Sequence, residues 1–292
     1  MRREWLQHRL GWALMAGLPT ALAVLGFGVG ELHFDESGPP GHLPSLIALA
    51  SLGGAIGLHL AIFVITGLII VTGLARRDHG DRSIEFWLSL PTGHAESLAV
   101  PLGVHLLVAP LAGLLVGLAS GLVVSLVLVL RVAGFGEWLA LPWGLLLGGA
   151  LTVAARLTLG LVLALLWVAP LMLAVVLLTA WFRRWGLVIG AVGIGLGSAV
   201  LDRLFGQPFL AQWLGAVLVN AGRSLGNTGS QPVTVEGAES LPLVLDALGR
   251  WALADAAAAV RLAGSPMLLG GLVLAAALFW ALVQWRRRGA GA

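Results

Sequence analysis

Long apolar runs alternate with shorter polar segments along almost the whole chain. Six runs are predominantly apolar: 11–30, 43–74, 98–130, 143–181, 186–204 and 266–285. A helix needs about 20 such residues to cross the hydrocarbon core of a membrane, so the pattern predicts six membrane-spanning helices. The run 98–130 is longer than a crossing needs. We expect it to be tilted, broken near Pro101 or Pro110, or projecting from the membrane.

The composition agrees with an all-α membrane protein. Hydrophobic residues make up 59% of the chain and charged residues 11%, whereas a soluble domain carries about 25% charged residues. The absence of Cys excludes disulfides, thiol catalysis and Cys-ligated metals. The chain also has no Lys, so it lacks a phosphate-binding loop, and any ATP is expected on another chain. A net charge of +3 gives no indication of nucleic-acid binding.

Arginine is distributed unevenly between the polar segments. The segments 1–10, 76–96, 182–185 and 286–292 hold three, three, two and three Arg, whereas 31–42 holds none and 131–142 holds one. The positive-inside rule therefore predicts that both termini are cytoplasmic. Residues 1–10 are expected to form an amphipathic helix on the cytoplasmic surface. A cleaved signal peptide is less favoured, because its small-residue motif, Ala21-Leu22-Ala23, lies inside the apolar run.

The region 205–265 does not fit a simple span. Its second half, 241–262, is long enough to cross but contains four charged residues: Asp246, Arg250, Asp255 and Arg261. Each central charge costs about 2.5–3.5 kcal/mol on insertion, and Asp246 and Arg250 are spaced to form an i, i+4 pair. We therefore expect an external cap of two re-entrant or surface helices before the last span.

Three ionisable residues within the spans are candidates for function. His59 and His105 lie in spans two and three and are possible polar residues of a transport pathway. The alternative is a neutral His bonded to a neighbouring helix. Arg156 faces a hydrated cavity or extends to the outer interface, and the second is favoured because Arg156 lies in the outer part of its span.

Glycine clusters in the spans favour close helix packing. The clusters are Gly53-Gly54-x-x-Gly57, Gly113-x-x-x-Gly117 and Gly193-x-Gly195-x-Gly197-Ser198. The last could also suggest a dinucleotide loop or a serine-protease site. A loop of the first kind needs a preceding strand and a protease needs a His partner, so packing is the favoured interpretation.

The segment 76–96 is the longest polar interruption in the first 200 residues, yet it contains an amphipathic block, Ile84–Leu90. A solvent-exposed loop has no need for Ile, Phe, Trp and Leu together. The block therefore either lies in the membrane surface or docks onto another protein.

Residues 81–91, with the sequence DRSIEFWLSLP, resemble the cytoplasmic loop of bacterial ABC-2 type transporter permeases. In that family a segment similar to RSI-x-FW-x-SLP follows the second span. The likeness extends to the N-terminal surface helix, the six spans and the enlarged external segment before the last span. It covers nearly the whole chain, although only 81–91 is motif-like.

The resemblance implies a membrane subunit of an exporter in the bacterial inner membrane, without enzyme activity or a cofactor of its own. Two copies, identical or related, would form the pathway with a seam along spans two and five, and two separate ATPase subunits would bind ATP and Mg²⁺. The cap would form the external gate. The coupling surface toward the ATPase would comprise Asp81, Arg82, Ser83, Ile84, Glu85, Phe86, Trp87 and Leu90.

A pathway lined by Leu, Val, Ala and Gly suits an amphipathic or lipid-like substrate better than an ion. Two other function classes remain open. A secondary transporter should show inverted repeats, and the chain has no convincing internal repeat. An intramembrane enzyme needs a converging polar group of residues, for which only His59, His105, Arg156 and Ser198 are available.

Overall fold

A computed structural model describes residues 2–30, 43–80, 93–206, 208–226 and 241–289, and every element in this part of the chain is helical. The elements of the first half are α1 (Arg2–Val29), α2 (Leu43–Gly80), α4 (His94–Gly103), the π-helical turn η1 (Val104–Val108), α5 (Ala109–Val132) and α6 (Phe135–Ala140). Those of the second half are α7 (Trp143–Phe182), the 3-10 turn η2 (Arg183–Trp185), α8 (Gly186–Phe205), α9 (Phe209–Gly226), α10 (Leu241–Ala263) and α11 (Pro266–Gly289).

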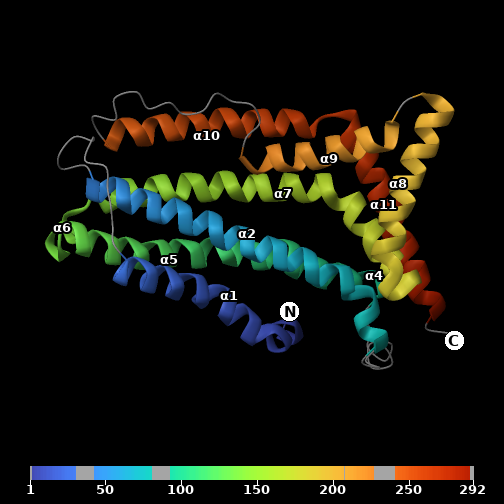
Figure 1. Cartoon of the computed structure of the whole chain (residues 1–292), viewed down its shortest axis with the longest axis horizontal. Coiled ribbons are helices and arrows are strands. Elements are labelled where there is room, and N and C mark those ends of the chain that lie inside the picture. Colours follow the sequence, from blue (N-terminus) through green and yellow to red (C-terminus); the bar gives the residue numbers. More distant parts are fainter. Residues whose placement is uncertain (1, 31–42, 81–92, 207, 227–240, 290–292) are drawn as a thin grey trace.

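The helices form an elongated bundle (Figure 1). Helices α2, α5 and α7 run lengthwise beside one another, with α1 along one flank and α9 and α10 along the other, while α8 and α11 stand across one end. The start of α4 and the ends of α2 and α11 lie toward that end. The largest apolar core lies between α2, α5 and α7 and includes Leu52, Ile56, Val129, Leu146 and Leu161.

Five helical stretches are long and apolar enough to cross a membrane: 9–29, 43–74, 94–132, 143–205 and 266–287. The prediction of a multi-pass, all-helical membrane protein is thereby confirmed. The expected spans 143–181 and 186–204 fall within one stretch because only the short turn η2 separates α7 from α8. The expected N-terminal surface helix and first span are continuous in α1. Six crossings with cytoplasmic termini remain a prediction.

Glycines on α5 allow it to lie directly against α2. Gly113, Gly117 and Gly121 recur every four residues and therefore share one helix face. A Cβ at Gly117 would lie 2.6 Å from Ile56 Cα, and one at Gly121 would lie 2.7 Å from Leu52 Cα. The packing prediction is confirmed for α5. By contrast, a Cβ at Gly53, Gly54 or Gly57 on α2, or at Gly193 or Gly195 on α8, would meet no described atom within 4 Å.

The long third run, 98–130, departs from α-helical geometry near the two prolines where a break was expected. The π-helical turn η1 lies between Pro101 and Pro110, and α4, η1 and α5 together run continuously from residue 94 to residue 132. At this turn a Cβ on Gly67 of α2 would collide with the His105 carbonyl oxygen. The turn therefore places the backbone of η1 against α2 at a position where only glycine fits.

Helices α9 and α10, expected to be two re-entrant or surface helices, pack lengthwise on α7 (Figure 1). Val217 and Ala221 of α9 and Ala252 and Ala259 of α10 are buried. The predicted pair between Asp246 and Arg250 is confirmed, with 2.5 Å between Oδ2 and Nη1. Residues 241–263 are not among the described stretches that are apolar enough to cross a membrane, in line with the four charges of α10. An external cap remains a prediction.

Candidate functional site

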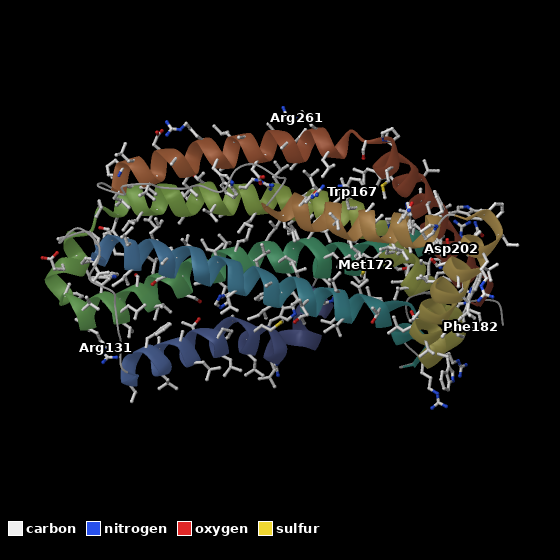
Figure 2. The ribbon with its side chains drawn as sticks, turned by 45° about the horizontal axis from the view of Figure 1, so that its top comes forward. Arg131, Trp167, Met172, Phe182, Asp202 and Arg261 are labelled. Atoms are coloured by element: carbon white, nitrogen blue, oxygen red, sulfur yellow. The ribbon has the colours of Figure 1, made fainter. Side chains whose placement is uncertain are left out.

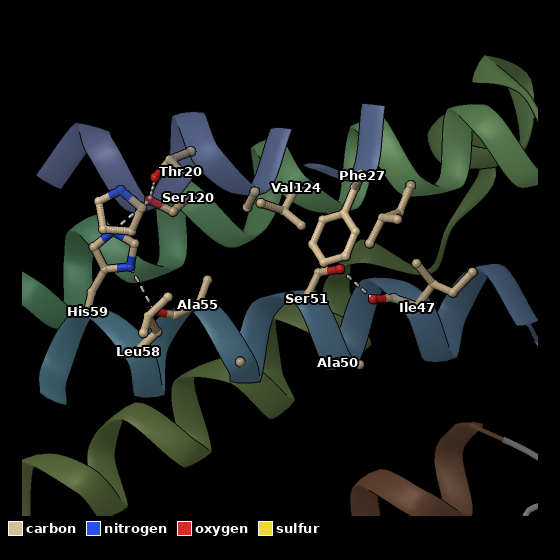
Figure 3. A pocket seen from close by; sticks show the side chains of 14 residues that line it. Thr20, Phe27, Ile47, Ala50, Ser51, Ala55, Leu58, His59, Ser120 and Val124 are labelled. Atoms are coloured by element: carbon tan, nitrogen blue, oxygen red, sulfur yellow. Dashed lines mark hydrogen bonds between the residues drawn. The ribbon is translucent and has the colours of Figure 1, made fainter. Parts of the chain in front are cut away.

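His59 is the centre of a polar network that joins three helices (Figure 3). Its Nδ1 lies 2.9 Å from the carbonyl oxygen of Ala55, one turn earlier on α2. A carbonyl oxygen only accepts hydrogen bonds, so Nδ1–H donates to it. The Ser120 hydroxyl of α5 lies 3.4 Å from Nε2 and 2.6 Å from the Thr20 hydroxyl of α1.

Each member of this network therefore has a partner within the protein. His59 is 1% exposed and Ser120 is 5% exposed, and Nε2 also lies 3.3 Å from the Ala16 carbonyl oxygen of α1. Buried polar groups are costly unless they are hydrogen-bonded. The alternative expectation for His59, a residue bonded to neighbouring helices, is confirmed. Its role in a transport pathway remains a prediction.

A cavity of about 350 Å³ opens beside this network, between α1, α2 and α5 (Figure 3). The network lies at one end of the cavity, and the rest of the lining is apolar apart from Ser51. The Ser51 hydroxyl donates to the Ile47 carbonyl oxygen at 2.7 Å and presents little polarity to the cavity. Cavities of this size with few polar groups are typical of sites for apolar or amphipathic ligands.

His105 does not join this site. It lies on η1, is 1% exposed, and its ring contacts Trp12 of α1 edge to face, with 6.3 Å between ring centroids. Its backbone lies against Gly67, as described above. The structure therefore places His59 and His105 on different helices, each contacting α1 at a different point.

A buried ion pair that the sequence reasoning missed joins α7 to α10. The Arg156 Nη2 and Nε donate to Asp255 Oδ2 at 2.5 Å and 2.9 Å, and Nη1 donates to the Ser224 carbonyl oxygen of α9 at 3.0 Å. Arg156 is 4% exposed and Asp255 is fully buried. The expectation that Arg156 extends to the interface is wrong, because the guanidinium finds its counter-charge inside the bundle. The signal available in the sequence was one Arg on α7 and one Asp on α10, each on a helix face that is otherwise apolar.

The predicted coupling surface lies outside the described residues. This applies to Asp81, Arg82, Ser83, Ile84, Glu85, Phe86, Trp87 and Leu90. The helices on either side of it are described. Val71 and Leu74 of α2 and Leu98 of α4 pack with α7 and α11 in one apolar cluster, whose other buried members are Val176, Leu177, Ala180, Leu282 and Val283. The Thr179 hydroxyl of α7 also donates to the Thr72 carbonyl oxygen of α2 at 2.8 Å.

The described residues contain no group of three or more His, Asp or Glu residues that could hold a metal ion. Ser120 and His59 are a possible nucleophile and base, but their 3.4 Å separation exceeds the about 2.6–3.2 Å typical of such pairs. Nδ1 is oriented by a carbonyl of its own helix rather than by a carboxylate. The network is better suited to holding helices together.

We compared the chain with protein-family models, with curated proteins and with solved structures, and none of these comparisons found a match.

Proposed function

We propose that this chain is the membrane-spanning subunit of an ATP-driven exporter of the ABC-2 type, located in the bacterial inner membrane. A second copy of the chain, or a related chain, would complete the pathway, and a separate pair of ATPase subunits would bind ATP. The proposal rests on the segment 81–91 and its resemblance to the coupling loop of that family. The absence of Lys, and hence of a phosphate-binding loop, is consistent with nucleotide binding on another chain.

The observation that carries the proposal is how the two helices beside this segment are anchored. A coupling element must transmit force, so the chain on both sides of it must be packed against helices that move. Both helices enter the apolar cluster with α7 and α11, α2 through Val71 and Leu74 and α4 through Leu98. A load applied to the segment 81–92 would therefore reach four helices at once, because packed apolar side chains resist independent displacement.

The residues of the segment suit docking. Phe86, Trp87 and Leu90 would fill an apolar groove on the ATPase, where aromatic anchors contribute most of the binding energy. Asp81, Arg82 and Glu85 would fix the orientation of the helix through charge complementarity. An amphipathic or lipid-like substrate agrees with the apolar interior and with the cavity between α1, α2 and α5.

Co-purification with an ATPase tests this function. The chain is expressed with an ATPase encoded beside its gene, and complex formation and ATP hydrolysis are measured in lipid vesicles. We expect Phe86→Asp to abolish both while leaving membrane insertion intact, because a charge cannot enter an apolar groove. Phe135→Asp, at an exposed site on α6, is the control and should retain both. Unchanged complex formation and hydrolysis in Phe86→Asp would refute the coupling role.

A further inference from the structure

The predicted crossing of α1 places the cavity between α1, α2 and α5 in one half of the membrane. The apolar stretch of α1 covers 21 residues, 9–29, which is close to the about 20 residues that cross a hydrocarbon core of about 30 Å. The cavity contacts α1 from Pro19 to Phe27. It therefore extends from the middle of this stretch to the end near Val29.

The length of the cavity matches one leaflet. Along α2 it is lined from Ile47 to His59, which corresponds to about 18 Å at a rise of 1.5 Å per residue. Half of the hydrocarbon core is about 15 Å thick. An extended hydrocarbon chain of one leaflet would fit lengthwise, with its methyl end at the His59 network.

The two ends of the cavity differ in chemistry. At the inner end, Thr20, Ser120 and His59 bond to one another and leave little polar surface for a ligand. At the outer end, the Arg131 Nη1 donates to the carbonyl oxygens of Phe27 and Gly30 at 2.5 Å and 2.7 Å and so holds the end of α1 to α5. Arg131 is exposed there (Figure 2), and its Nη2 can donate to an anion.

Aromatic residues mark the same end as an interface. Trp138 stacks on Phe135, with 6.1 Å between ring centroids, and contacts Trp143 at 4.9 Å. The Trp143 Nε1 donates to the Trp138 carbonyl oxygen at 3.0 Å. Trp residues gather where hydrocarbon meets headgroups, so Arg131 lies at the depth of lipid headgroups.

We propose that this cavity binds one acyl chain of an anionic membrane lipid, with the lipid headgroup at Arg131 and the end of the chain at His59. An apolar cavity does not hold water well, and its lining would lose dispersion contacts if it stayed empty. The bilayer supplies hydrocarbon chains at the open side between α1 and α2. This lipid site does not depend on the proposed ATPase partner.

Photolabelling in lipid nanodiscs tests the site. The purified full chain is placed in nanodiscs with a trace of phosphatidylglycerol or phosphatidylcholine that carries a diazirine on its acyl chain, and labelled residues are mapped by mass spectrometry. We expect labels on the cavity faces of 19–27, 47–59 and 120–128, with phosphatidylglycerol preferred. Arg131→Gln should remove that preference.

Two glycines of α2 provide a matched pair of variants. Gly54 lines the cavity and Gly57 does not, and a Cβ at either would meet nothing within 4 Å. Gly54→Leu should therefore fill the cavity without disturbing the packing and reduce labelling about tenfold, the factor that a loss of about 1.4 kcal/mol in binding produces. Gly57→Leu should label like the unmodified chain. Ala50→Phe is a second filling variant with the same expected loss.

Three results would overturn the proposal. The first is that the cavity residues are labelled no more strongly than Leu115. Leu115 lies on α5 outside the cavity and is 71% exposed, so it serves as the reference for labelling by surrounding lipid. Another is undiminished labelling in both Gly54→Leu and Ala50→Phe. Equal labelling by the two lipids in the unmodified chain would remove the assignment of an anionic headgroup.

Discussion

Replacing Asp255 with Ala is expected to destabilise the bundle by about 3–5 kcal/mol, the usual cost of leaving one member of a buried ion pair without its partner. Arg156 is 4% exposed, and its Nη2 and Nε both donate to Asp255 Oδ2. Removing the carboxylate leaves a guanidinium with only the Ser224 carbonyl oxygen as a bonded acceptor. A loss of this size is a large fraction of the total stability of a folded domain, about 5–15 kcal/mol.

The same helix provides a control. Asp246 pairs with Arg250 at 2.5 Å, the same separation as the shortest contact of the buried pair, but the two side chains are 58% and 73% exposed. Exposed i, i+4 pairs contribute only about 0.3–0.5 kcal/mol. Each Asp→Ala change also gains a similar amount of helix propensity. The difference between Asp255→Ala and Asp246→Ala therefore isolates the effect of burial.

Unfolding in detergent, followed by tryptophan fluorescence, measures both variants against the unmodified chain. The double variant Arg156→Leu/Asp255→Leu should recover most of the loss, because apolar replacement of a whole buried pair is often neutral. The reasoning would be refuted if the free energies of unfolding of Asp255→Ala and Asp246→Ala differed by less than about 1 kcal/mol, because the expected difference is about 3–5 kcal/mol. A double variant as unstable as Asp255→Ala would refute it equally.

Two further predictions concern packing and orientation. Gly117→Ala should lower the free energy of unfolding by about 1–3 kcal/mol through overpacking, because its Cβ would press on Ile56. Gly57→Ala should not lower it, because its Cβ would meet no described atom within 4 Å. Equal effects of the two variants would contradict the α2–α5 contact. Because the chain has no Cys, single cysteines report on topology. A membrane-impermeant maleimide should label Gly136→Cys on intact cells and Arg184→Cys only after permeabilisation, and the reverse pattern would invert the orientation derived from the positive-inside rule.

The sequence predicts well those features that depend on neighbouring residues. The apolar stretches could be found because hydropathy is a property of one continuous segment, and each is a helix in the structure. The Asp246–Arg250 pair could be predicted because its members are one helical turn apart. The four-residue spacing of the glycines of α5 predicted close helix packing correctly. The same prediction is not met by Gly54 and Gly57 of α2, where an added Cβ would have no described atom within 4 Å.

Features that depend on distant residues could not be derived in this way. Arg156 and Asp255 are 99 positions apart, so no local pattern in the sequence identifies them as partners. For His59 the general expectation of a bond to a neighbouring helix was correct, but nothing in the sequence identified Thr20 and Ser120 as members of its network. The cavity likewise depends on how α1 lies against α2 and α5, which local patterns do not specify.

The position of α9 and α10 leaves the predicted orientation of the termini unchanged. A Cβ at Gly197 of α8 would lie 3.6 Å from Leu210 Cδ2 at the start of α9. The first turn of α9 also shares a cavity with Met267 and Gly270 of α11. The chain therefore leaves α8 and enters α11 at neighbouring points (Figure 1). A segment that starts and ends on the same side of a membrane crosses it an even number of times. Whether α9 and α10 lie outside the membrane or both enter it, the end of α8 and the start of α11 stay on one side.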